Sequence, residues 1–259
     1  MTFKIGILAT GITPDALIDE FGSYADMFPR LLGKAGFEFD YRTFDVRDGE
    51  FPAAATDCDG WIITGSKANV YEDLPWMRTL KGLIRDIYQA DRPMLGICFG
   101  HQIIADAFDA RVDKFSGGWG VGLHQYTLKR PVEDLALASS TFTLSAMHQD
   151  QVLEKPEAAE VLAESAFCPY AVLRYDNRIL TFQAHPEFDV TFERRLVQHL
   201  KGQSVPEADA NQALDGLSKP DAATDSLAIA AWMARFLTRD ADEQSNSSNA
   251  SERTEEACP

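Results

Sequence analysis

Strand and helix patterns alternate along the first hundred residues, and this alternation constrains the fold more than any other feature. Short runs of apolar, β-branched and aromatic residues predict strands at residues 3–9, 37–44, 60–64 and 94–97. Apolar residues at helical spacing predict helices over 24–34 and 74–90. A chain that alternates in this way builds a parallel sheet covered by helices on both faces.

The second half of the chain has a different pattern. From Val112 onward, polar and apolar residues alternate in short runs, which predicts hairpins over 121–128, 142–148 and 170–185, the last with a turn at Asp176 and Asn177. We therefore expect antiparallel strands to be mixed into the sheet.

The C-terminal third begins with a predicted helix over 188–200 and a surface segment over 202–224 that has room for one short helix. A last apolar helix is expected over 226–237, with one face formed by Leu227, Ala230, Ala231, Ala234 and Leu237. Residues 1–238 are predicted to form one domain, with 202–238 as a C-terminal extension. Residues 239–259 hold too few apolar side chains to offset the entropy of ordering, so we expect a disordered acidic tail.

Composition excludes several classes of partner and location. The 24 basic and 40 acidic residues give a net charge of -16, which argues against a nucleic-acid or anionic membrane surface. No run approaches the roughly 20 apolar residues of a membrane helix, and the short apolar N-terminus is not a signal peptide, so we expect a cytoplasmic protein. The four cysteines form no C-x-x-C pair, and reduced thiols without a metal or cofactor are expected.

One cysteine lies in a special context. The segment GICFG, residues 96–100, is a G-x-C-x-G motif at the predicted junction of a strand and a helix, where such an elbow presents a nucleophile above the sheet edge. The N-terminus of the following helix would stabilise a thiolate at Cys98. A buried thiol in a tight turn explains this segment equally well.

A candidate base follows much later in the chain. The segment QAHPEF, residues 183–188, ends an apolar strand and offers His185 to take the thiol proton and Glu187 to orient the imidazole. Alone, the tripeptide His-Pro-Glu is more often part of a loop. Together with the elbow upstream, it points to a triad of Cys98, His185 and Glu187.

The two motifs CFGHQ and HPE, at this separation, resemble the class I glutamine amidotransferase family over about residues 40–200. The resemblance implies a flavodoxin-like three-layer α/β fold with a mostly parallel central sheet. It also implies attack of the Cys98 thiolate on the side-chain amide of glutamine, release of ammonia, and hydrolysis of a glutamyl thioester.

The same resemblance implies further site residues. Backbone N–H groups of Gly65, Ser66 and Phe99 would form the oxyanion hole, although Gly65-Ser66-Lys67 replaces the usual Gly-Gly-Pro. Residues implied to bind or surround the substrate are Gln102, Gly118, Trp119 and His148. Ala184 replaces the glycine that many relatives have before His-Pro-Glu, which is a mild change.

The chain carries no Walker A loop and no pyrophosphatase loop, so the chemistry of an ammonia acceptor is absent from it. Its organisation resembles stand-alone proteins related to the amidotransferase domain of GMP synthase, some of which are γ-glutamyl peptidases. We expect a free-standing hydrolase of glutamine or a γ-glutamyl compound. The alternatives are a glutaminase subunit that serves a separate synthetase and, less favoured, a binding module that has kept only the fold.

Overall fold

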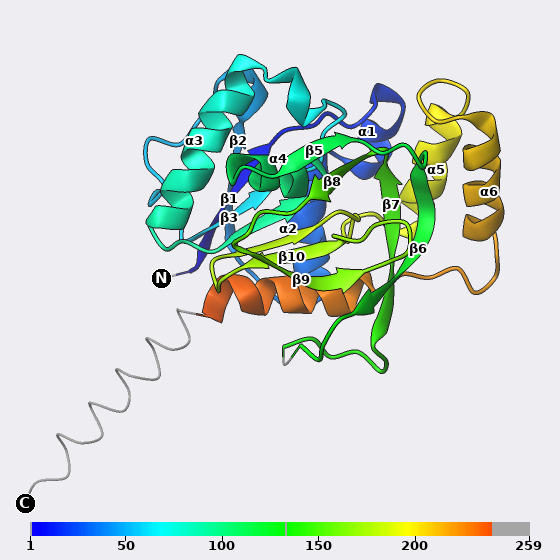
Figure 1. Ribbon diagram of the computed structural model, residues 1–259. Helices are drawn as coiled ribbons and strands as arrows, with labels where there is room; N and C mark the ends of the chain where they lie inside the picture. Colours follow the sequence, from blue (N-terminus) through cyan, green and yellow to red (C-terminus); the bar gives the residue numbers. More distant parts are fainter. Residues whose placement is uncertain (1, 133, 240–259) are drawn as a thin grey trace, which may run out of the picture.

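The computed structural model describes residues 2–132 and 134–239, which are built around a nine-stranded sheet (Figure 1). The strand order is β2-β1-β3-β4-β11-β10-β9-β6-β7. Each pair of neighbours from β2 to β11 is parallel. These five strands are β1 (Lys4–Ala9), β2 (Asp40–Asp45), β3 (Gly60–Ile63), β4 (Met94–Ile97) and β11 (Ile179–Phe182). The predicted parallel part of the sheet is therefore confirmed.

The other half of the sheet is antiparallel, as the hairpin patterns predicted. It consists of β10 (Val172–Tyr175), β9 (Ala159–Glu164), β6 (Gly120–Leu128) and β7 (Thr141–His148). The expected turn between β10 and β11 is present, with Asp176 in the left-handed region at φ 50°. The hairpin patterns did not predict β9, nor the separate pair of β5 (Arg111–Lys114) and β8 (Asp150–Glu154).

The helices form two layers. On one face, α2 (Tyr24–Lys34) and a helix over residues 226–239 share an apolar core with β1 and β4. On the other face, α3 (Pro75–Gln89) and α4 (Phe99–Ala107) share a second core with β3 and β4. The remaining helices are α1 (Asp15–Phe21), α5 (Val190–Leu200), α6 (Glu207–Leu217) and two 3-10 turns at Val46–Asp48 and Val70–Glu72. This arrangement is the expected three-layer α/β fold.

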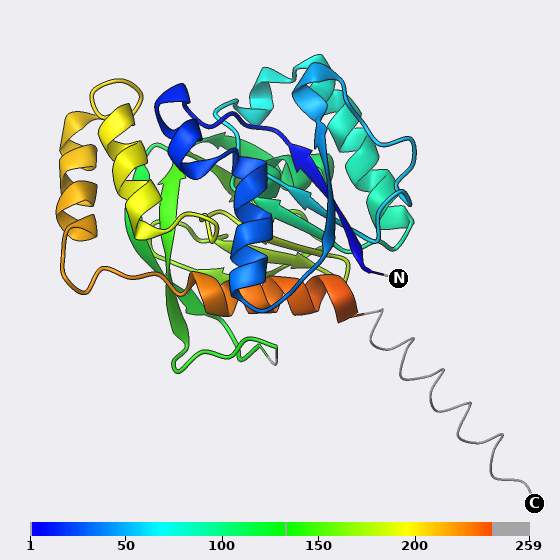
Figure 2. The same ribbon diagram turned by 180° about the vertical axis from the view of Figure 1, so that it is seen from behind.

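The last helix buries most of its predicted apolar face, since Ala230, Ala234 and Leu237 are buried, but the prediction is wrong for Leu227. Leu227, predicted on the buried face, is 53% exposed, whereas Trp232 and Phe236 are fully packed. The Trp232 ring meets Phe182 of β11 edge-on at 5.4 Å, so the buried face of the helix also includes aromatic side chains that the prediction left out. Figure 2 shows this helix and α2 on the same side of the sheet. Residues 240–259 of the predicted acidic tail lie outside the described residues.

Candidate active site

Three neighbouring parallel strands bring the predicted site residues to one edge of the sheet. Gly65 follows β3, Cys98 follows β4, and His185 follows β11. Because these strands are adjacent and run in the same direction, their carboxyl ends open onto a common region, which is where ligands bind in open α/β sheets. Residues separated by more than a hundred positions in the sequence thus become neighbours.

Cys98 occupies a strained turn between β4 and α4. Its backbone has φ 51° and ψ -101°, a conformation that is unfavourable for a residue with a side chain. The flanking glycines serve close packing: a Cβ on Gly96 would lie 2.5 Å from Ile104 Cδ1, and one on Gly100 would lie 2.4 Å from Ile63 O. The strain is therefore on the cysteine itself, and the glycines let β4 and α4 approach each other.

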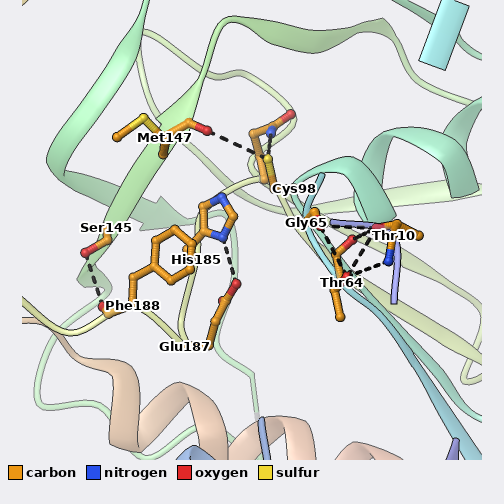
Figure 3. A network of polar contacts seen from close by, with 10 residues as sticks. Thr10, Thr64, Gly65, Cys98, Ser145, Met147, His185, Glu187 and Phe188 are labelled. Carbon is orange, nitrogen blue, oxygen red and sulfur yellow. Dashed lines mark hydrogen bonds and ion pairs between the residues drawn. The ribbon is translucent and has the colours of Figure 1, made fainter. Parts of the chain in front are cut away.

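The His185 ring lies between Cys98 and Glu187 (Figure 3). Its Nδ1 is 2.8 Å from Glu187 Oε1, which leaves Nε2 for the side of Cys98. The ring also stacks on Phe188 with centroids 4.0 Å apart and planes at 4°. The carboxylate and the phenyl ring together fix the orientation of the imidazole.

The electrostatic surroundings favour a charged His185. Burial acts to lower the pKa of His185, but the negative charge of Glu187 and then of Cys98, together with hydrogen bonds to both side chains, raises it well above the ordinary value. An imidazolium that faces a thiol stabilises the thiolate. This arrangement can supply both an activated sulfur and a proton donor for a leaving group.

The edge strand β7 holds the site from another side. Ser145 O accepts from the backbone N–H of His185 at 2.8 Å, and the Ser145 hydroxyl donates to Phe188 O at 3.2 Å. Two residues further on, Met147 O lies 3.9 Å from Cys98 Sγ, within reach of the thiol proton. The strand thus contacts the main chain of His185 and the side chain of Cys98.

Gly65 lies close to the side chains of Cys98 and His185, which are predicted to react. A Cβ at this position would lie 2.9 Å from His185 Cε1 and 3.7 Å from Cys98 Cβ. Phe99 begins α4, where the geometry of a helix leaves the first N–H groups without an intrahelical partner. Ser66 lies at the same turn, where its hydroxyl accepts from Ala68 N. The oxyanion role of Gly65, Ser66 and Phe99 stays a prediction.

Gln102 and His148 are both buried beside the site. The Gln102 amide nitrogen donates to Asp150 O at 2.8 Å and to Gln183 Oε1 at 3.1 Å. His148 Nδ1 is 3.2 Å from the same carbonyl, and burial followed by the nearby His124 and His185 lowers the pKa of His148 to about 3. A neutral, buried imidazole fits the expectation that His148 lines the pocket and takes no part in proton transfer.

Gly118 and Trp119 lie just before β6. Gly118 has φ 92°, a left-handed conformation that glycine adopts readily. Trp119 lines a cavity of about 700 Å³ between β6 and α6, and Cys98 and His185 are not among its lining residues. The implied role of Gly118 and Trp119 in substrate binding stays a prediction.

Sequence reasoning missed two polar residues of the site, Thr10 and Gln183. Thr10, after β1, donates from its hydroxyl to Thr64 O at 2.8 Å and to Gly65 O at 3.2 Å, and so anchors the Gly65 turn. Gln183 Nε2 lies 3.7 Å from Cys98 Sγ. A signal was available for Gln183, because residues two apart on a strand point to the same side, and His185 is two positions on.

Within residues 2–132 and 134–239, no helix combines the length and the apolar character needed to cross a membrane. In the same part of the chain, no three His, Cys, Asp or Glu side chains gather as metal ligands would.

These observations define a three-layer α/β protein that aligns a thiol, an imidazole and a carboxylate at the carboxyl ends of its central parallel strands. The sequence model of the glutamine amidotransferase class-I family matches residues 16–199. The chain belongs to the class I glutamine amidotransferase family.

Individual relatives fall into three groups. A Schizosaccharomyces pombe protein described as glutamine amidotransferase-like is 29% identical over 92% of this chain and 99% of its own length. Gamma-glutamyl peptidase 4 of Arabidopsis thaliana is 32% identical over 70% of this chain and 76% of its own. A glutamine-hydrolyzing GMP synthase subunit of Halobacterium salinarum is 30% identical over 70% of this chain and 92% of its own.

A solved structure shares the fold at low sequence identity. A glutamine amidotransferase from Thermotoga maritima superposes with a TM-score of 0.72 at 16% identity, over 92% of this chain and 99% of the other. This similarity supports the flavodoxin-like architecture.

Proposed function

We propose that this protein is a free-standing hydrolase that cleaves the γ-glutamyl amide bond of glutamine or of a γ-glutamyl compound. The observation that carries the proposal is the position of His185, buried between Cys98 and Glu187. Family membership and the similarity to a γ-glutamyl peptidase point to the same bond.

The proposed reaction has two stages. The Cys98 thiolate attacks the γ-carbonyl carbon, and the C–N bond breaks as His185 gives its proton to the leaving nitrogen. The products of this stage are an amine or ammonia and a glutamyl thioester. Water then attacks the thioester carbon, His185 takes a proton from that water, and glutamate leaves as the C–S bond breaks.

Other residues have supporting roles in this proposal. Each stage passes through a tetrahedral oxyanion, and N–H groups of Gly65, Ser66 and Phe99 are the proposed donors to it. Gly118, Trp119 and His148 are proposed to line the substrate pocket.

The first prediction concerns Cys98. Cys98→Ala removes the sulfur but keeps a small side chain in the turn, so the fold should persist while release of ammonia or amine falls to background. Turnover is measured on glutamine and on a panel of γ-glutamyl peptides and amines, with circular dichroism as the check on folding. A folded Cys98→Ala protein that keeps wild-type turnover would remove this thiol from the mechanism.

A glutaminase subunit is the second candidate, because the chain is 30% identical to the GMP synthase subunit over 92% of that relative. The same panel separates the two functions. Strong activity of the isolated chain on γ-glutamyl peptides favours the hydrolase, whereas weak activity together with co-purification of a synthetase from lysate favours the subunit.

We also propose a cytoplasmic location. Cys58, Cys98 and Cys168 are free thiols, which suits a reducing compartment.

A further inference from the structure

We propose that the side-chain amide of Gln183 donates a hydrogen bond to the Cys98 thiolate and is a further catalytic residue of this site. The inference rests on the proposed function, in which Cys98 is the nucleophile. Gln183 is completely buried, and its Nε2 lies 3.7 Å from Cys98 Sγ.

The direction of this hydrogen bond follows from a chain of contacts that begins at a backbone carbonyl. Asp150 O can only accept, so the Gln102 group 2.8 Å away must be its amide nitrogen. The same Gln102 nitrogen lies 3.1 Å from Gln183, which must therefore present its amide oxygen to Gln102. The remaining Gln183 group, the NH₂, is left facing the sulfur.

This chain of contacts removes the usual ambiguity between the oxygen and the nitrogen of the Gln183 side-chain amide. If Gln183 were turned over, its NH₂ would face the Gln102 NH₂, and its oxygen would face Cys98 Sγ. The first change would place two donors against each other in a buried site, and the second would place a partial negative charge against the thiolate. The backbone at Asp150 thus fixes which atom Cys98 meets.

The sulfur needs such a donor because its surroundings also include an acceptor. Met147 O, at 3.9 Å, suits the neutral thiol, whose proton it can accept, and repels the thiolate. The Gln183 amide offsets this repulsion and remains in place after His185 has given its proton away. A neutral amide is suited to this role because it stabilises the thiolate without adding a further charge to the site.

The inference also gives Gln102 a positioning role. Its amide nitrogen already makes two hydrogen bonds within the protein, to Asp150 O and to Gln183 Oε1. Gln102 therefore orients Gln183 and acts on the sulfur through that neighbour, in addition to the substrate-binding role that the family resemblance implies.

The test is the pH dependence of Cys98 alkylation by iodoacetamide, followed on the Cys98 peptide by mass spectrometry. Gln183→Met keeps the volume of the side chain but removes the donor. We expect the midpoint of the alkylation profile to rise by about one pH unit, which corresponds to about tenfold slower alkylation below the midpoint. An unchanged midpoint in the folded variant overturns the inference.

A second variant tests the orientation while Gln183 stays intact. Gln102→Glu replaces the orienting nitrogen by an acceptor, so Gln183 should turn its NH₂ toward residue 102 and its oxygen toward the sulfur. The midpoint should rise again, and turnover with a γ-glutamyl substrate should fall in parallel. If Gln183→Met does not fold, this variant decides the matter: a wild-type midpoint overturns the inference.

Gln151 provides the matched control, because it is equally buried but donates to Phe167 O. Gln151→Met should leave the midpoint where it is in the wild type, and an equal shift in this control overturns the inference. The wild-type profile tests the proposed function separately. If native Cys98 reacts no faster near neutral pH than it does in the urea-unfolded chain, the nucleophile assignment fails, whatever the variants show.

Discussion

At the scale of single residues, the site depends on close approach as much as on polar groups. Gly65 illustrates this, because Cys98 and His185 both pack against the place where its side chain would be. Thr10 and Thr64 hold the same turn by their hydroxyls, so the backbone there has little freedom to move away. Space for the imidazole therefore depends on the absence of one methyl group.

We predict that Gly65→Ala disables the site without unfolding the protein. The new Cβ would lie 2.9 Å from His185 Cε1, so the ring must shift from its position between Cys98 and Glu187. A misplacement of this size should lower kcat/KM on a γ-glutamyl substrate roughly 10- to 100-fold. The control is Gly82→Ala in α3, where nothing lies within 4 Å of the new Cβ and activity should be unchanged. Equal activity of both variants would contradict the tight packing.

At the scale of secondary-structure elements, a buried carboxyl group joins α5 to β6. Glu193 of α5 is fully buried, and its Oε1 accepts from the backbone N–H of Gly122 at 3.1 Å, where β6 takes a left-handed φ of 86°. Burial raises the pKa of Glu193 to about 8, against the opposing effects of His185 and the Gly122 N–H and with a further rise from Glu187. The other titratable groups that face it are Tyr24 and Tyr126.

This pKa predicts how stability depends on pH. In the unfolded chain Glu193 loses its proton near the ordinary value of 4.5, whereas the folded protein keeps it up to about 8. The folded state binds more protons between these values, so the contribution of Glu193 to stability falls as pH rises from 4.5 to 8. Gln keeps the acceptor for Gly122 but does not titrate, so Glu193→Gln should flatten this part of the profile.

The measurement is the urea unfolding midpoint at about pH 5.5 and about pH 8. The matched control is Glu157→Gln on an exposed turn, which should keep the wild-type difference between the unfolding midpoints at the two pH values. A profile that is equally steep in Glu193→Gln would mean that Glu193 is already ionised in the folded protein.

The elements also show what the sequence could predict and what it could not. The β4–α4 elbow and the segment with His185 and Glu187 were predictable because each is a local motif with its own spacing. Glu193 was not, because its partner at Gly122 is 71 residues away and nothing local in α5 distinguishes a buried carboxyl group. The strand β9 was missed because its sequence, AEVLAE, combines apolar residues with alanine and glutamate, which favour helices.

At the scale of the whole molecule, the C-terminal extension completes the core. The family match ends at residue 199, yet the helix over 226–239 covers the sheet face opposite α3 and α4. Trp232 packs edge-on against Phe182, the residue that precedes Gln183. Stability of the extension and geometry of the site are therefore connected through the end of β11.

We predict that Trp232→Ala lowers the free energy of unfolding by about 3 to 5 kcal/mol, the usual cost of removing a large buried aromatic side chain. Urea denaturation measures this loss. The control is Leu227→Ala on the same helix, which is 53% exposed and should cost no more than about 0.5 kcal/mol. Similar losses in the two variants would mean that the helix is not oriented as described.

The last strand of the sheet, β7, has an outer edge with little of its backbone left open. Asp225 makes hydrogen bonds to the backbone N–H and the backbone carbonyl of Thr143. The His185 N–H donates to Ser145 O, and Cys98 Sγ faces Met147 O. Uncovered strand edges recruit other chains, so these residues also shield the protein from aggregation. Conditions that loosen the loop carrying His185 should therefore promote self-association before the rest of the fold melts, and a bound substrate should suppress it.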